Sequence, residues 1–191
     1  HGRLAGVPYP IIPGHVSVGE VAATGGPVYD IEGQPVTVGK PVTFLDVHET
    51  CHSCWYCLIG KQSTRCPSRK VYGITYSAND GLLGGWSEAI YLKPGVKIVP
   101  LMGAVTPEEW IAGGCGLPTA LHAVDLSHIR LGDKVLIQGA GPVGINACAL
   151  ALASGAGWVG LIDNVPKRLA IAKRMGADAC LTPDEALPAV R

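Results

Sequence analysis

The sequence carries no excess charge of either sign, because 15 basic residues balance 15 acidic residues among its 191 positions. Proteins that bind nucleic acid usually present a basic face, so this balance argues against a nucleic-acid partner. Charged residues make up only 16% of the chain and hydrophobic residues 48%, whereas disordered chains have the opposite bias. The composition therefore predicts a folded protein with a well-packed interior.

The sequence also lacks an uninterrupted apolar segment of the length that crosses a membrane. Its longest apolar run, Val143–Ile162, is broken by Asn146, Ser154 and several glycines. A buried helix followed by a buried strand explains this run better than a membrane span. No Gly-x-Ser-x-Gly segment occurs and no pair of carboxylates stands out, so neither a nucleophile elbow nor a paired-carboxylate site is indicated.

Cysteine, in contrast, is concentrated in one short stretch. Four of the seven cysteines lie in the run CHSCWYCLIGKQSTRC, at Cys51, Cys54, Cys57 and Cys66. Two-residue gaps let three thiolates converge and a short loop returns the fourth, which predicts a closed, structural zinc site. An odd total of cysteines does not suit a disulfide framework, so we expect metal ligation in a reducing compartment, the cytoplasm.

The residue composition and the expected secondary structure change near Thr106. The part before it is rich in Gly, Pro and short β-type runs, namely Val16–Ala23, Pro41–Val47 and Trp86–Leu92, which predicts a barrel-like β domain over residues 1–105. The part after it, residues 106–191, reads as alternating elements. We expect a helix that begins near Pro107, further helices near 118–126, 142–154 and 166–175, and strands at 135–138, 159–162 and from 179. That order is typical of a doubly wound parallel sheet.

A glycine-rich segment joins the first of these strands to the next helix. It reads Gly139-Ala140-Gly141-Pro142-Val143-Gly144, and its place between a strand and a helix indicates a dinucleotide site. The glycines suit a tight turn, a close approach to pyrophosphate and close helix packing. Asp163, at the end of the second strand, can accept hydrogen bonds from ribose hydroxyls and favours NAD over NADP. Arg168 could instead neutralise a 2′-phosphate.

Together these motifs resemble the zinc-containing alcohol dehydrogenases of the medium-chain dehydrogenase/reductase family. Within that family, the four-cysteine lobe (residues 51–66) and the segment KVYGI (residues 70–74) are most similar to the polyol and threonine dehydrogenases. Further matches are Pro13-Gly14-His15 with Gly19 and Val21, Gly84–Glu88, and Gly114-Cys115-Gly116. The resemblance implies a GroES-like β-barrel catalytic domain followed by a truncated Rossmann sheet. It also implies an oxidoreductase that transfers a hydride between a small-molecule alcohol or polyol and NAD, acting as a dimer or tetramer.

The resemblance implies two zinc ions, of which the structural one is held by the four-cysteine lobe. The catalytic one would be bound by His15 and Cys115, with Gly139, Gly141, Pro142, Val143, Gly144, Asp163 and Arg168 at the cofactor. Val16 replaces the Glu that usually follows this His, so metal affinity or exchange is expected to differ. The family's first cysteine ligand falls upstream of His1 and is absent.

Two other functions remain open at this stage. A full doubly wound sheet has about six strands, so we expect this chain to be the middle of a longer polypeptide. If it is instead complete, it is a non-catalytic, zinc-stabilised dinucleotide-binding module. A zinc-free quinone or enone reductase of the same superfamily is the second alternative, and the cysteine lobe with His15 and Cys115 argues against it.

Overall fold

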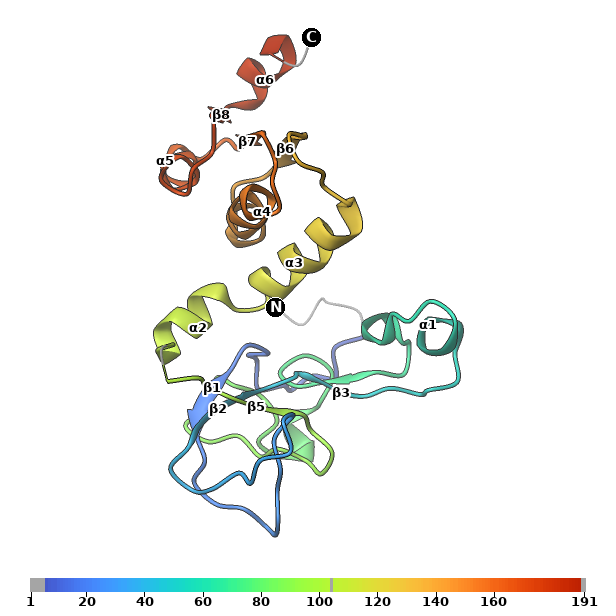
Figure 1. Cartoon of the computed structure of the whole chain (residues 1–191). Helices are drawn as coiled ribbons and strands as arrows, with labels where there is room; N and C mark the ends of the chain where they lie inside the picture. The colour runs from blue at the N-terminus through green and yellow to red at the C-terminus, as the bar shows by residue number, and fades with distance from the viewer. Residues whose placement is uncertain (1–5, 104, 190–191) are drawn as a thin grey trace. The chain divides into compact units, whose positions relative to one another are not determined.

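The computed structural model describes residues 6–103 and 105–189. The chain divides into two compact units, His1–Ile111 and Ala112–Arg191, each of which is described by itself (Figure 1). We refer to them as unit 1 and unit 2. Helix α2 (Pro107–Gly113) begins where the sequence predicts a change of architecture, and its first turn carries Glu108 and Glu109, as suits a helix N-terminus.

Unit 1 is built from short strands and long connections. Strands β1 (Val18–Glu20), β2 (Pro41–Phe44) and β5 (Ile98–Pro100) form an antiparallel sheet in the order β1-β2-β5. Strands β3 (Val47–Glu49) and β4 (Lys70–Val71) pair antiparallel in a second, two-stranded sheet. The remaining elements are α1 (Trp55–Leu58) and the short 3-10 helices η1 (Ser63–Arg65) and η2 (Ala78–Asp80).

Two expectations for this unit are wrong in detail. The strands of the described residues form two separate sheets and do not close into a barrel. The run Trp86–Leu92 is not a strand, because the Ser87 hydroxyl donates to the carbonyl oxygens of Gly84 (2.8 Å) and Ala89 (2.6 Å) and bends the chain there. The run resembles a strand in composition, and local side-chain bonding overrides that tendency.

The interior of unit 1 contains a cluster of aromatic rings. Tyr72 is fully buried and packs edge-on against Phe44 and Tyr76, with ring centroids 5.1 and 5.3 Å away. The Tyr76 hydroxyl lies 2.7 Å from Nδ1 of His48 and donates to Oε1 of Glu49 at 3.1 Å. Buried hydroxyls need partners, and these bonds tie the tyrosine core to strand β3.

Unit 2 follows the predicted alternation of strands and helices. Strands β6 (Lys134–Gln138), β7 (Trp158–Ile162) and β8 (Ala179–Leu181) pair parallel in the order β6-β7-β8. Helices α4 (Pro142–Ala153) and α5 (Pro166–Arg174) make the crossovers, with α3 (Gly116–Ser127) before the sheet and α6 (Pro183–Ala189) after it. The strand–helix–strand–helix–strand prediction is therefore confirmed, whereas the sheet is only part of a full Rossmann sheet.

The core of unit 2 lies between the sheet and its helices. Cys148, Val159 and Leu161 are fully buried there, so Cys148 packs as a small apolar residue. The apolar run Val143–Ile162 divides into α4 and β7, as predicted. Among the described residues, no helix combines the length and apolar character that spanning a bilayer requires.

Candidate metal and dinucleotide sites

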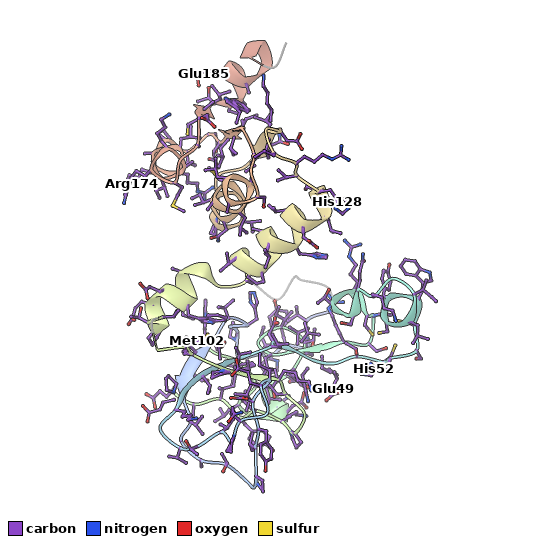
Figure 2. The ribbon with its side chains drawn as sticks, viewed as in Figure 1. Glu49, His52, Met102, His128, Arg174 and Glu185 are labelled. Carbon is purple, nitrogen blue, oxygen red and sulfur yellow. The ribbon has the colours of Figure 1, made fainter. Side chains whose placement is uncertain are left out.

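The four cysteines of the 51–66 lobe converge on one point. Their sulfur atoms all lie within 4.8 Å of one another, and the Sγ atoms of Cys54 and Cys57 are 3.5 Å apart. Tetrahedral zinc with Zn–S bonds of about 2.3 Å separates its sulfurs by about 3.8 Å. The donor set and its spacing therefore fit a closed zinc site. Figure 2 shows sulfur atoms gathered in this lobe close to His52.

Local backbone geometry brings the sulfurs together. Cys54 precedes helix α1, and the Cys57 N–H bonds to the Cys54 carbonyl at 3.0 Å, so both face one side of a tight turn. Cys66 ends η1, with its N–H on the Ser63 carbonyl at 2.9 Å. The backbone N–H of Cys51 points at the Cys66 sulfur at 3.3 Å, and the N–H of Cys54 at the Cys51 sulfur at 3.3 Å. Such N–H donors stabilise thiolates.

The pKa values of two of these thiols are shifted in opposite directions. Hydrogen bonds from the Ser53 side chain, and then from the backbone N–H groups of Ser53 and Cys54, lower the pKa of Cys51 to about 5. Burial, and then the neighbouring Cys54 thiol, raise the pKa of Cys57 to about 11. Hydrogen bonding thus favours the thiolate form of Cys51, whereas burial favours the neutral thiol form of Cys57. A bound cation would allow all four to be thiolates.

Neither histidine beside the lobe joins the sulfur cluster. His48 is held by Tyr76 and by the Pro94 carbonyl, which lies 3.0 Å from its Nε2 atom. His52 is exposed and contacts the Thr50 hydroxyl at 3.3 Å. The grouping of four cysteines without a histidine is the one that the sequence predicts for the structural zinc.

The glycine-rich loop of unit 2 has the geometry of a strand-to-helix turn. Gly139 has φ +100°, a left-handed conformation that glycine adopts without strain, and its N–H bonds to the Ile162 carbonyl at 2.8 Å. Gly141 caps α4, and Pro142 begins it. Gly144 is buried, and a Cβ there would overlap the Gly139 carbonyl oxygen. The N–H groups of the first helical turn therefore lie directly beside the loop.

Asp163 fastens this loop to the end of strand β7. Its Oδ2 atom accepts the Ala140 N–H at 2.8 Å and its Oδ1 atom accepts the Val165 N–H at 2.8 Å. These two bonds, with Arg168 at 3.8 Å from Oδ2, hold the pKa of Asp163 below its ordinary value. The carboxylate therefore stays ionised at neutral pH. The sequence pattern predicts its place but not the bond to Ala140, because a backbone donor leaves no mark in the sequence.

A cavity of about 480 Å³ opens beside the loop within unit 2. Helix α3, strand β6 and helix α4 form its walls, and Gly139, Gly141, Pro142, Val143 and Gly144 are among its lining residues. Pro142 and Val143 are both exposed. The lining is mainly apolar, as is usual for cofactor sites.

Cys115 lies next to this part of unit 2. It is exposed and immediately precedes helix α3. Its neighbour Gly116 is buried, and a Cβ on Gly116 would lie 3.4 Å from Pro142 and 3.5 Å from the Asn146 amide. The close approach of Gly116 to the start of α4 thus brings Cys115 near the dinucleotide loop, a proximity that the sequence motif does not reveal.

His15 lies in unit 1 on a bend that glycines shape. Gly14, with φ +101°, accepts the Gly85 N–H at 2.9 Å, and Pro13 accepts the Trp86 N–H at 2.8 Å. His15 and Val16 are half-buried. Because His15 belongs to unit 1 and Cys115 to unit 2, their pairing at one metal stays a prediction.

Comparison with known proteins connects both units to one group of enzymes. The family described as "Alcohol dehydrogenase GroES-like domain" matches residues 1–102. The 5-exo-hydroxycamphor dehydrogenase of Pseudomonas putida is 32% identical over 100% of this chain and 52% of its own length. The L-threonine 3-dehydrogenase of Idiomarina loihiensis is 34% identical over 89% of this chain and 45% of its own.

Solved structures agree with these relatives. The alcohol dehydrogenase of Thermotoga maritima superposes with a TM-score of 0.86 at 33% identity, over 95% of this chain and 50% of that one. A cobalt- and zinc-bound thermostable alcohol dehydrogenase from Pyrobaculum aerophilum gives a TM-score of 0.68 at 30% identity, over 95% of this chain and 51% of its own. The chain spans about half the length of the curated relatives it matches.

Proposed function

Because the chain belongs to the alcohol dehydrogenase GroES-like domain family, we propose that it is part of a zinc-dependent oxidoreductase that transfers a hydride between an alcohol or polyol and NAD. The observation that carries the proposal is the pairing, in one chain, of a four-sulfur cluster with a glycine loop fastened by Asp163. Domain boundaries at 1–105 and 106–191, a cytoplasmic location and a homo-oligomer, dimer or tetramer, belong to the same proposal.

The four-cysteine lobe would hold a structural zinc ion. Its four thiolates fill a tetrahedral coordination sphere, so no position remains for substrate. Among the lobe's residues, only Cys66 is fully buried. A segment with so little apolar core depends on metal for its order. The function of this site is therefore to keep residues 51–66 folded, and a reducing compartment keeps its thiols available.

The glycine loop would hold the dinucleotide. The first-turn N–H groups of α4 donate to pyrophosphate, and the absence of a side chain at Gly141 lets the backbone come close. Asp163 has lone pairs beyond those used by Ala140 and Val165, and these can accept ribose hydroxyls. Its negative charge repels a 2′-phosphate, which favours NAD, the cofactor that accepts the hydride when it is bound.

His15 and Cys115 would be ligands of a second, catalytic zinc ion. An imidazole nitrogen and a thiolate form a donor set that suits zinc and leaves a position open for an alcohol oxygen. When bound, the ion supplies Lewis-acid stabilisation of a deprotonated alcohol. Val16 cannot supply the carboxylate that relatives carry next to this histidine. His15 therefore has one fewer charged neighbour to orient it, and we expect faster exchange of this metal.

Metal analysis and turnover test the proposal together. The protein expressed from its complete reading frame should contain about two zinc ions per chain, and alcohols should drive NADH formation. His15→Ala should remove one zinc ion and the turnover while leaving the lobe's zinc in place. Zinc-free protein that reduces enones would identify a quinone or enone reductase instead. Zinc and NADH binding without turnover of any alcohol would identify a non-catalytic binding module.

A further inference from the structure

We propose that Trp86 forms an apolar wall next to His15 and selects bulky, apolar alcohols over polyols and amino acids. The inference rests on the proposed function, since it requires the alcohol to bind at His15. It goes further by assigning a substrate class and the residue that determines it. Trp86 is 79% exposed, which is unusual for the largest apolar side chain and leaves its indole available to a ligand.

The Trp86 indole contacts Gly14, the glycine that precedes His15. A Cβ on Gly14 would lie only 2.7 Å from Cδ1 of Trp86, so the ring rests on the Gly14 backbone. The Trp86 N–H bonds to the Pro13 carbonyl at 2.8 Å. Trp86 is thus fastened to the two residues that come directly before His15.

Close glycine contacts make this arrangement stiff. A Cβ on Gly84 would overlap the Ile12 carbonyl, and one on Gly73 would overlap the Gly14 carbonyl. The Gly73 N–H in turn bonds to the Leu83 carbonyl at 2.8 Å. Three chain segments, residues 6–19, 71–76 and 81–87, therefore pack backbone to backbone around Gly14. Because Trp86 is held by such contacts, its indole keeps its position when a ligand binds. Selection of a substrate by its shape requires such a fixed position.

These three segments contain almost nothing that could bind a polar substrate by charge. No Asp, Glu, Lys or Arg occurs in residues 6–19, 71–76 or 81–87. An amino-acid substrate needs a cation for its carboxylate, and each extra hydroxyl of a polyol needs a hydrogen-bonding partner. Asp80 is the nearest acid before the last segment, and it is already bonded to the Ser77 N–H at 3.1 Å. Glu88, exposed and two residues beyond Trp86, is an acidic side chain that could serve a polyol instead.

The test compares three kinds of alcohol with the zinc-loaded protein expressed from its complete reading frame. Borneol represents bulky apolar alcohols, propan-2-ol small ones, and D-arabinitol and L-threonine polar ones. We expect the wild type to prefer borneol in kcat/KM. Trp86→Ala should lower kcat/KM for borneol by about 10- to 100-fold and change propan-2-ol by less than about 3-fold. Trp86→Phe should recover most of the loss.

Two controls separate selection from general damage. Tyr29→Ala removes another exposed aromatic side chain of unit 1, 60% accessible, and should leave the ratio of borneol to propan-2-ol unchanged. Glu88→Gln should do the same. Unfolding temperatures of all variants should agree closely, since an exposed side chain contributes little to stability.

The outcomes distinguish this inference from the proposed function. If no alcohol reduces NAD, the proposed function fails. If alcohols are oxidised but arabinitol or threonine is preferred, or if Glu88→Gln and not Trp86→Ala shifts the preference, the assignment of Trp86 is wrong. An unchanged ratio in Trp86→Ala also overturns it, because Trp86 would then only pack against another part of the protein.

Discussion

Replacement of Gly144 by alanine measures how tightly the dinucleotide loop is built. A Cβ at this position overlaps the Gly139 carbonyl oxygen, so the turn must move outward. Such overpacking costs about 1–3 kcal/mol. The displaced turn also weakens the bond from the Gly139 N–H to the Ile162 carbonyl, a loss of about 1 kcal/mol. The higher helix propensity of alanine than of glycine stabilises the folded state by about 1 kcal/mol and offsets part of this loss. We therefore expect a net destabilisation of about 1–3 kcal/mol.

Gly113→Ala provides the matched control. Gly113 is also in a helix, α2, but its Cβ would meet only Leu117 carbon atoms at 3.7 Å, an ordinary contact. The substitution should leave the free energy of unfolding unchanged or raise it by up to about 1 kcal/mol. Since 1 kcal/mol corresponds to about 4–8 °C in a unit of this size, calorimetry should place the unfolding of Gly144→Ala about 5–20 °C below the wild type. Equal unfolding temperatures for the two variants would refute the reasoning.

Three further predictions follow from the described contacts. Cys66→Ser should remove one zinc ion per chain and open the lobe to protease, which atomic absorption and limited proteolysis would reveal; full retention of zinc contradicts it. Tyr76→Phe should lower the free energy of unfolding by about 1–2 kcal/mol through its lost hydroxyl bonds, and Tyr29→Phe, at an exposed site, should not. Because the pKa of Asp163 is lowered in the folded protein, its bonds stabilise unit 2 above the ordinary pKa, about 3.9, and this contribution is lost as the pH falls through the lower folded value. Asp163→Asn should therefore flatten the loss of stability below about pH 4 in acid titrations followed by circular dichroism, and an unchanged slope contradicts it.

Unit 2 could be predicted closely because each of its elements carries a local signal. Pro142 and Pro166 stand at the first turns of α4 and α5, and Gly176, with φ +100°, follows the end of α5. Strand β7 is a short apolar run between Gly157 and Asp163. Each of these signals depends only on residues that are neighbours in the sequence, so it can be recognised without knowledge of the rest of the fold.

Unit 1 could be predicted only in outline. Its strands are two to four residues long, too short for an alternating pattern to establish itself. The four cysteines are an exception, because metal ligation fixes their spacing in the chain. The placement of Trp86 on Gly14 is different again: it depends on glycines from three distant segments, and nothing in any one of them indicates the partners.

The contact between Gly116 and Pro142 has an electrostatic consequence. Each is the first residue of its helix, so two helix N-termini end at the same corner of unit 2 and their positive partial charges add there. Cys115 precedes one helix and the glycine loop precedes the other. An anion bound near Cys115 and a pyrophosphate at the glycine loop would both be attracted by this potential, and an anion at either place would weaken the attraction of the other. Binding at Cys115 and binding at the glycine loop would therefore be coupled, with the same coupling free energy in both directions.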